Sequence, residues 1–208
     1  MNEQTTAPWG NLVGIRPVKR VVKMMNDGLC DEKIETVLKQ DFAVSSEKTA
    51  LAMKIAKIEL EVMKTIPKNA VSLYIDIPFC PSKCVYCSFA SMPVSEMKDF
   101  IEPYLNALYL ELDKIKTIVT DLNLEIVSIY IGGGTPTSIL SLELDNLLYK
   151  ITRTFDLSGL REFTIEAGRP DTITESKLEV MQKYGVDRIS INPQSMNDKT
   201  LDMIGRKH

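Results

Sequence analysis

Three cysteines on a short loop, directly after a predicted strand, constrain this chain more than any other feature. They are Cys80, Cys84 and Cys87, spaced C-x3-C-x2-C. Apolar residues alternate with polar ones over residues 71–77, which predicts a strand that leads into the loop. Two prolines beside the first cysteine restrict the backbone there, so the three thiols are expected to converge. The loop is therefore predicted to hold a metal group, and three unrelated thiols are the alternative.

The number of ligands indicates which metal group this is. Four cysteines close the coordination shell of a zinc ion or an iron–sulfur cluster, whereas three leave one position open. A zinc site would need a fourth ligand, but the single histidine is His208, the last residue, and the single further cysteine is Cys30, far upstream. A 4Fe-4S cluster with three cysteine ligands and one open iron fits better. An open iron indicates a site of chemistry.

The cysteine loop resembles the cluster loop of the radical S-adenosylmethionine (SAM) enzymes. The wider match covers residues 71–208 and is similar to the oxygen-independent coproporphyrinogen III oxidases; its motifs are YIDIPFCPSKCVYCSF, YIGGGTPT and RISINPQSMNDKTLDMIGR. In that superfamily the open iron binds SAM, and the reduced cluster cleaves SAM to methionine and a 5′-deoxyadenosyl radical. The resemblance therefore implies a 4Fe-4S cluster and SAM as cofactors.

Strands and helices alternate from Val71 onward, which predicts an α/β fold with parallel strands and right-handed crossovers. The further strands are expected at residues 125–131, 162–167 and 187–192. The resemblance implies a partial (β/α)6 radical SAM barrel with about four βα units present. Residues 1–67 are predicted to form a small helical N-terminal segment, and residues 68–208 a radical SAM core domain that is truncated at its C-terminus.

Two helices are predicted in enough detail to be checked. Residues 46–66 are expected to pack through an apolar stripe of Leu51, Ile55, Ile58 and Val62. Pro103 is expected in the first turn of the next helix, where a proline is tolerated. The buried side of that helix is predicted to carry Leu105, Leu108, Leu112, Ile115 and Val119.

The residues expected to hold SAM lie where predicted strands end, which is where ligands bind in α/β barrels. Glycines at such an end let a ligand approach the backbone, although a plain tight turn is the alternative. By resemblance, Gly133, Gly134 and Thr135 hold the methionyl end of SAM. Tyr74 and Glu166 are also expected to contact SAM by resemblance. Packing alone would explain Tyr74 almost as well.

A second SAM is implied by the later motif. Gln194 and Arg206 match family residues that contact it, a role shared with the backbone around Tyr86, Gly134 and Thr135. For Glu166 the alternative is structural, because a carboxylate that closes an apolar strand needs a partner. A salt bridge to Arg169 or Arg188 would supply one.

The resemblance implies oxidative decarboxylation of coproporphyrinogen III to protoporphyrinogen IX in haem biosynthesis, with a flavodoxin- or ferredoxin-type reductant. The EAGRP and PWGNLVGIRP stretches favour this branch. Asp76 replaces a histidine of the characterised oxidases and Phe89 a cysteine, so substrate handling is open. Residues 87–89 also resemble the haem chaperones, which is the second hypothesis. The third is a truncated chain that binds a cluster without turnover.

Charge and hydropathy exclude other classes. A net charge of −3 in 208 residues argues against a general nucleic-acid binder. No apolar run reaches the ~18 residues that a membrane span needs, and reduced cysteines favour a cytoplasmic location. Four cations near the N-terminus, Arg16, Lys19, Arg20 and Lys23, are expected either to contact an anionic substrate or to form a solvated face. The solvated face is favoured.

Overall fold

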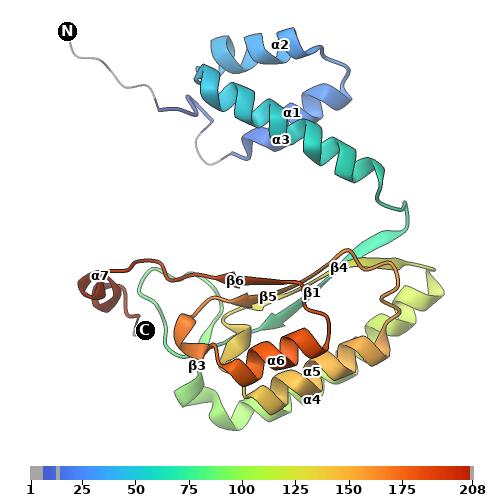
Figure 1. Ribbon diagram of the computed structural model, residues 1–208, viewed down its shortest axis with the longest axis vertical. Coiled ribbons are helices and arrows are strands. Elements are labelled where there is room, and N and C mark those ends of the chain that lie inside the picture. Colours follow the sequence, from blue (N-terminus) through green and yellow to red (C-terminus); the bar gives the residue numbers. More distant parts are fainter. Residues whose placement is uncertain (1–6, 13–14, 207–208) are drawn as a thin grey trace. The chain divides into compact units, whose positions relative to one another are not determined.

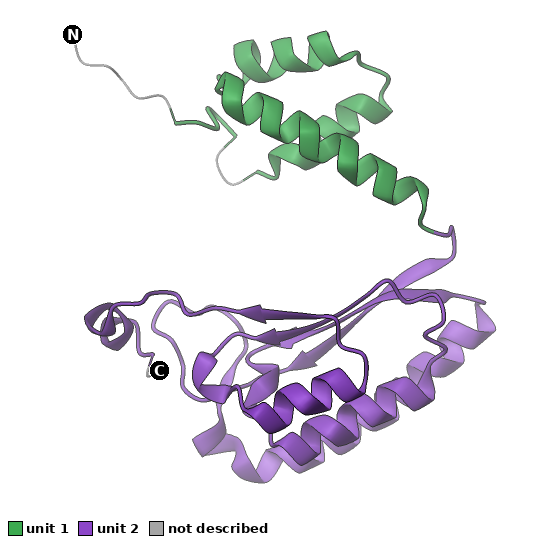
Figure 2. Ribbon diagram, in the orientation of Figure 1, with its two compact units in different colours: residues 1–66 green, residues 67–208 purple. Residues whose placement is uncertain are grey.

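The computed structural model describes residues 7–12 and 15–206, so His208 lies outside the described residues. The chain divides into two compact units, residues 1–66 and 67–208 (Figure 2). The first unit is helical, with α1 (Pro17–Asn26), α2 (Asp31–Thr36), a π-helical segment η1 (Val37–Asp41) and α3 (Ser46–Lys64). Helix α1 was not predicted from the sequence. It begins with a proline at its first position, where the missing N–H leaves no bond unmade.

The packing face predicted for α3 is wrong. The apolar stripe that includes Leu51 and Ile58 is exposed, and Ile58 is 56% exposed. The side chains of α3 that are buried are Thr49, Ala52, Met53 and Ala56. The core of this unit instead forms around the small side chains of α3, Ala52 and Ala56, against which the other helices of the unit pack. Amphipathic spacing thus identified the helix but not the face that packs.

The second unit is an α/β layer. Its strands are β1 (Ala70–Ile77), β2 (Phe79–Cys80), β3 (Met92–Pro93), β4 (Glu125–Gly133), β5 (Glu162–Ala167) and β6 (Arg188–Ile191). Its helices are α4 (Val94–Asp121), α5 (Ser141–Thr154), α6 (Glu175–Lys183) and α7 (Asp198–Met203), with short 3-10 turns η2 (Pro136–Ser138) and η3 (Pro170–Thr172). The main sheet has the order β1-β4-β5-β6, and every pairing in it is parallel. The predicted alternating α/β fold is confirmed.

Helices α4, α5 and α6 lie together on one side of this sheet (Figure 1). Alternate strand residues face them and are buried, namely Ile75, Ile77, Ile129, Ile131, Phe163 and Ile165. The other face of the sheet is polar: Ser128 Oγ donates to Ser72 Oγ at 2.7 Å, and the ring of Tyr74 stacks on that of Tyr130. The two faces follow from the period of two along a strand.

Pro103 does not begin a helix. Helix α4 starts at Val94, so Pro103 lies inside it and removes one backbone hydrogen bond, to the carbonyl of Asp99. The helix continues because its apolar face is longer than predicted: Ile101 is buried along with Leu105, Leu108 and Leu112, while Ile115 and Val119 are partly buried. Packing of this face against the sheet outweighs the local preference of the proline.

Among the described residues, strand β6 pairs on one side only, with β5. Two of its apolar side chains, Ile189 and Ile191, are exposed.

Within the described residues, no helix has the length and apolar character needed to cross a membrane.

Candidate functional site

The cysteine loop follows β1 and is tied to the rest of the unit by backbone contacts. Cys80 Sγ lies 3.3 Å from Thr135 Oγ1, which belongs to the loop after β4. On the far side of the loop, Val85 N donates to the carbonyl of Ile204 at 3.1 Å, and Ser82 Oγ donates to the carbonyl of Gly205 at 3.1 Å. Segments more than a hundred residues apart in sequence thus hold the loop.

Arg169, in the loop after β5, fastens the middle of the cysteine loop. It is 3% exposed, and its Nη1 donates to Ser82 Oγ at 3.0 Å. Its Nε and Nη2 donate to the two carboxylate oxygens of Asp171, at 3.1 and 3.2 Å. Asp171 therefore fixes the guanidinium plane while the guanidinium fixes Ser82. Ser82, the residue that Arg169 holds, lies between Cys80 and Cys84 in sequence.

Arg169→Gln is expected to lower the free energy of unfolding by about 1–3 kcal/mol, because the hydrogen bonds of the buried guanidinium to Ser82 and Asp171 are lost. It should also speed iron loss to a chelator, since the loop would move more freely. The matched control is Arg188→Gln, whose ion pair with Glu162 is exposed and should change stability by less than about 1 kcal/mol. Equal chelation rates for Arg169→Gln and the unmodified chain would contradict a role in holding the loop.

Two glycines shape the end of β4 beside the cysteines. Gly133 has φ +108°, and a Cβ there would lie 2.3 Å from Asp76 Oδ1. A Cβ on Gly134 would lie 2.8 Å from the carbonyl oxygen of Phe79 and 3.1 Å from Cys80 Sγ. The close approach of the backbone to the first cysteine therefore requires glycine.

Glu166 does not form the salt bridge that was its structural alternative. Arg169 pairs with Asp171 and Arg188 with Glu162, whereas Glu166 accepts a hydrogen bond from the phenol of Tyr130. The Tyr130 ring in turn stacks on Tyr74, with centroids 5.9 Å apart. Two aromatic rings and a carboxylate thus line the polar face of the sheet.

Burial, together with the hydrogen bond and the negative charge of Glu166, raises the pKa of Tyr130 to about 12. A free tyrosine titrates near ~10, so between these values the folded chain holds a proton that the unfolded chain has lost. Tyr130 therefore contributes stability that is lost as the pH rises from ~10 towards 12.

We expect Glu166→Gln to lower the pKa of Tyr130, because the negative charge that opposes phenolate formation is removed. The measurement is ultraviolet absorbance of phenolate at high pH, with Tyr130→Phe identifying the signal of this residue. An unchanged titration in Glu166→Gln would show that the carboxylate does not act on Tyr130.

Arg206 and Gln194 are held in unusual surroundings. Arg206 is 4% exposed; its Nη1 donates to the carbonyl of Asn192 and its Nη2 to that of Gly168, both at 2.6 Å. Its Nε is buried without a partner among the described residues. Gln194 has φ +64°, a strained conformation for a residue with a side chain and one that often marks functional sites.

Two adjoining cavities bring these residues together. The first, about 210 Å³, is lined by all the predicted site residues except Tyr74, namely Cys80, Cys84, Cys87, Tyr86, Gly133, Gly134, Thr135, Glu166, Gln194 and Arg206. The second, about 230 Å³, is lined by Tyr74, Asp76, Phe89, Ala90, Tyr130, Gly133 and Glu166. They share Phe89, Gly133 and Glu166, so one continuous lining runs from the cysteines to the tyrosines.

The arrangement of the thiols suits a cluster better than a single ion. No group of three His, Cys, Asp or Glu side chains in residues 7–12 and 15–206 is close enough to hold one metal ion. A 4Fe-4S cluster places each thiolate on a different iron, so its three cysteines need to line one cavity. Cys80, Cys84 and Cys87 do so, and the glycine at position 134 keeps the space beside Cys80 clear.

The sequence analysis did not assign a functional role to Tyr130, Arg169 or Tyr104. Tyr130 and Arg169 belong to motifs that had been singled out, but only the strand register and the loop packing show what they contact. Tyr104 donates to the carbonyl of Asp76 at 2.7 Å from the buried side of α4. The signal that could have found Tyr130 was its place two residues before the first glycine of GGGTPT, on the same face as Glu166.

Residues 74–208 match the family model of the Radical SAM superfamily. The oxygen-independent coproporphyrinogen-III oxidase-like protein HemZ of Bacillus subtilis (strain 168) is 43% identical over 206 residues, which are 98% of this chain and 41% of that protein. The heme chaperone HemW of the same organism is 39% identical over 138 residues, 66% of this chain and 35% of that protein.

Among solved structures, the coproporphyrinogen III oxidase HemN of Escherichia coli, a radical SAM enzyme, shares the fold with a TM-score of 0.54 at 22% identity. The match covers 73% of this chain and 34% of that one. The chain thus spans about two fifths of the length of HemZ and about one third of the other two proteins.

Proposed function

Because this chain belongs to the radical SAM superfamily, whose cofactors are a 4Fe-4S cluster and SAM, we propose that it is the catalytic part of an oxygen-independent coproporphyrinogen III oxidase. In the proposed reaction two propionate side chains of coproporphyrinogen III become vinyl groups. Each one loses a hydrogen atom to the 5′-deoxyadenosyl radical, and then one electron and one molecule of carbon dioxide. When bound, the cluster and SAM supply a hydrogen-abstracting radical through one-electron cleavage of SAM. A flavodoxin- or ferredoxin-type protein in the cytoplasm is the proposed reductant.

One observation carries the proposal. The similarity to an oxidase-like protein extends over 98% of this chain, through both compact units, whereas the similarity to a heme chaperone covers 66% of it. The helical unit is therefore shared with the oxidase-like relative. The heme chaperone is kept as the second candidate because its identity, 39%, is also substantial.

In this reaction the proposed role of the chain's own residues is to bind and orient the cluster and SAM. Cys80, Cys84 and Cys87 would hold three irons of the cluster. Beside them the backbone at Gly134 and the hydroxyl of Thr135 would hold the amino group on the methionyl end of SAM. The glycines keep side chains out of this space, so the ligand can approach the loop closely.

Polar groups at the ends of β5 and β6 would complete the SAM sites. Glu166 can accept a hydrogen bond from a ligand hydroxyl or amine while Tyr130 holds its other side in place. Arg206 lines the first cavity, and two backbone carbonyls orient its terminal nitrogens, so its positive charge would be fixed beside a carboxylate of bound SAM. Gln194 lines the same cavity and would supply a neutral amide there.

The proposal is tested with the full-length protein that contains this chain. Under strict anaerobiosis, with reductant, SAM and coproporphyrinogen III, it should release two molecules of carbon dioxide per protoporphyrinogen IX formed, together with methionine and 5′-deoxyadenosine. The 208-residue chain should assemble the cluster but turn over poorly. Stoichiometric haem binding by the full-length protein, with no decarboxylated product, would favour the chaperone instead.

A further inference from the structure

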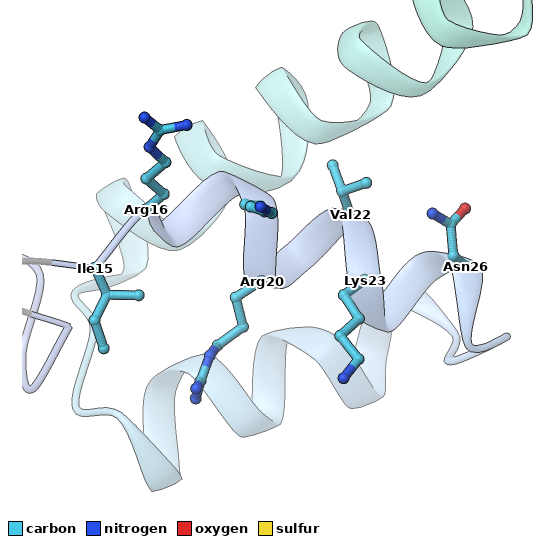
Figure 3. A pocket seen from close by; sticks show the side chains of 7 residues that line it. Ile15, Arg16, Arg20, Val22, Lys23 and Asn26 are labelled. Carbon is cyan, nitrogen blue, oxygen red and sulfur yellow. The ribbon is translucent and has the colours of Figure 1, made fainter.

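Helix α1 carries four cations on its solvent-facing side. Arg16 is its N-cap, and Lys19, Arg20 and Lys23 follow at spacings of three, four and seven residues. Lys19, Arg20 and Lys23 are close enough in sequence to lie on one side of an α-helix, whereas Arg16 extends from the N-cap in another direction (Figure 3). The opposite side, at Val21, is fully buried in the core of the helical unit. The four positive charges are therefore held together by the packing of the helix.

These charges are not neutralised within the described residues. None of the four cations forms an ion pair with a described carboxylate, whereas Lys39, Lys48, Lys57 and Lys64 of the same unit each do. The first turn of α1 contains no acidic residue. Arg20 has one contact, over the Phe42 ring at 4.4 Å, which orients it without reducing its charge.

The cations border an open surface groove of about 570 Å³. Its lining also includes Ile15, Val22 and Asn26. Figure 3 shows Arg20 and Lys23 extending from one side of α1 and Arg16 from the other. Ile15 is 47% exposed, an apolar side chain that this surface leaves open to water. The surface thus combines an apolar centre with positive charge at its edges.

We propose that this cavity, the α1 cationic groove, binds the carboxylates of a tetrapyrrole, with the apolar macrocycle against Ile15 and Val22. The inference rests on the proposed function, because coproporphyrinogen III combines an apolar ring with four propionate groups. Arginine and lysine both form charge-assisted hydrogen bonds with carboxylates, and arginine can do so with two at once. The groove would capture the substrate; no part in the decarboxylation itself is assigned to it.

The size of the charged surface favours a small polycarboxylate over a long polyanion. Nucleic acids and anionic membranes meet wide surfaces, and their binding proteins usually carry an extended basic stripe. This chain has a net charge of −3, and helix α2 next along the chain begins with Asp31 and Glu32. A long polyanion would be repelled by much of this surface, whereas a ligand confined to the groove would meet four cations.

The test measures binding of coproporphyrin III, the stable oxidised form of the proposed substrate, to the 208-residue chain by fluorescence, without cluster, SAM or reductant. Changing Arg16, Lys19, Arg20 and Lys23 together to Gln should weaken binding roughly 16-fold or more, at about twofold to fivefold for each cation. The matched control changes four exposed lysines of the same unit, Lys33, Lys39, Lys54 and Lys64, to Gln. It should alter binding by less than about threefold, since the net charge falls equally but the groove is intact.

Two further variants keep the result interpretable. Arg20 contacts Phe42, so a triple variant that leaves Arg20 in place guards against misfolding and should still weaken binding roughly tenfold. Arg16→Lys combined with Arg20→Lys keeps the charge and should retain most of the affinity. Weakened binding to phosphatidylglycerol vesicles or duplex DNA, with coproporphyrin III unaffected, would overturn the proposal, as would equal losses in the groove and control variants.

Failure of this inference differs from failure of the proposed function. If the full-length protein decarboxylates coproporphyrinogen III but the quadruple variant binds coproporphyrin III as tightly as the unmodified chain, only the groove is wrong. If coproporphyrin III binding depends on the groove but no decarboxylated product forms, the oxidase activity is wrong.

Discussion

Replacing Cys80, Cys84 or Cys87 singly with alanine will abolish the 4Fe-4S cluster. Anaerobic reconstitution of the unmodified chain should give about four irons and four sulfides, one cluster per chain. Each cysteine is the proposed ligand of a different iron, and the three line one cavity in which no other thiol of the described residues takes part. Loss of any one leaves an iron without its thiolate, so each variant should lose nearly all bound iron and sulfide.

Cys30→Ala is the matched control. Cys30 is an exposed thiol at the N-cap of α2, in the helical unit, and its removal should leave the iron and sulfide content unchanged. Tightly bound zinc without sulfide in the unmodified chain would overturn the cluster assignment. So would a cysteine-loop variant that retains a full cluster.

Arg206→Ala is expected to have the second largest effect, because this side chain joins two loops and lines the first cavity. Its removal leaves the carbonyls of Gly168 and Asn192 without their donor, which should lower the free energy of unfolding by about 2–4 kcal/mol. The same change removes the unpartnered Nε, and SAM binding to the cluster-loaded chain should weaken at least tenfold, roughly the effect of one charge-assisted hydrogen bond.

Arg206→Lys separates the loss of stability from any loss of the cluster. Lysine keeps the charge but cannot bridge two carbonyls in the fixed geometry of a guanidinium, so stability should fall while iron and sulfide content stays near that of the unmodified chain. Lys199→Ala, an exposed cation on the neighbouring helix α7, is the control and should change neither property. Unchanged SAM affinity in both Arg206 variants, measured by equilibrium dialysis, would restrict Arg206 to a structural role.

Much of the fold could be predicted because its signals are local. Alternating apolar residues marked β1, alternation of predicted strands and helices indicated the parallel sheet, and the helical spacing of Leu105, Leu108 and Leu112 marked α4. Since parallel strands end at one edge of a sheet, motifs at their ends were expected to meet, and the cysteines, GGGTPT, Glu166 and Arg206 do line one cavity.

The parts that could not be predicted depend on packing between distant segments. The face of α3 that packs is chosen by the close approach of its neighbours at Ala52 and Ala56, not by its most apolar stripe. Helix α4 begins at Val94 and continues through Pro103 because its buried face also includes Ile101, upstream of the proline. The same is true within the site, where Arg169 reaches Ser82 across 87 residues of sequence.

The free side of β6 affects how the size of this chain in solution should be interpreted. A strand paired on one side only leaves a row of main-chain donors and acceptors open, and such a row is a template on which another strand can add. Here exposed Ile189 and Ile191 lie on the same strand. Oligomers of the 208-residue chain that grow with protein concentration would therefore report strand addition at this edge, and their stoichiometry would say nothing about the assembly of the full-length protein.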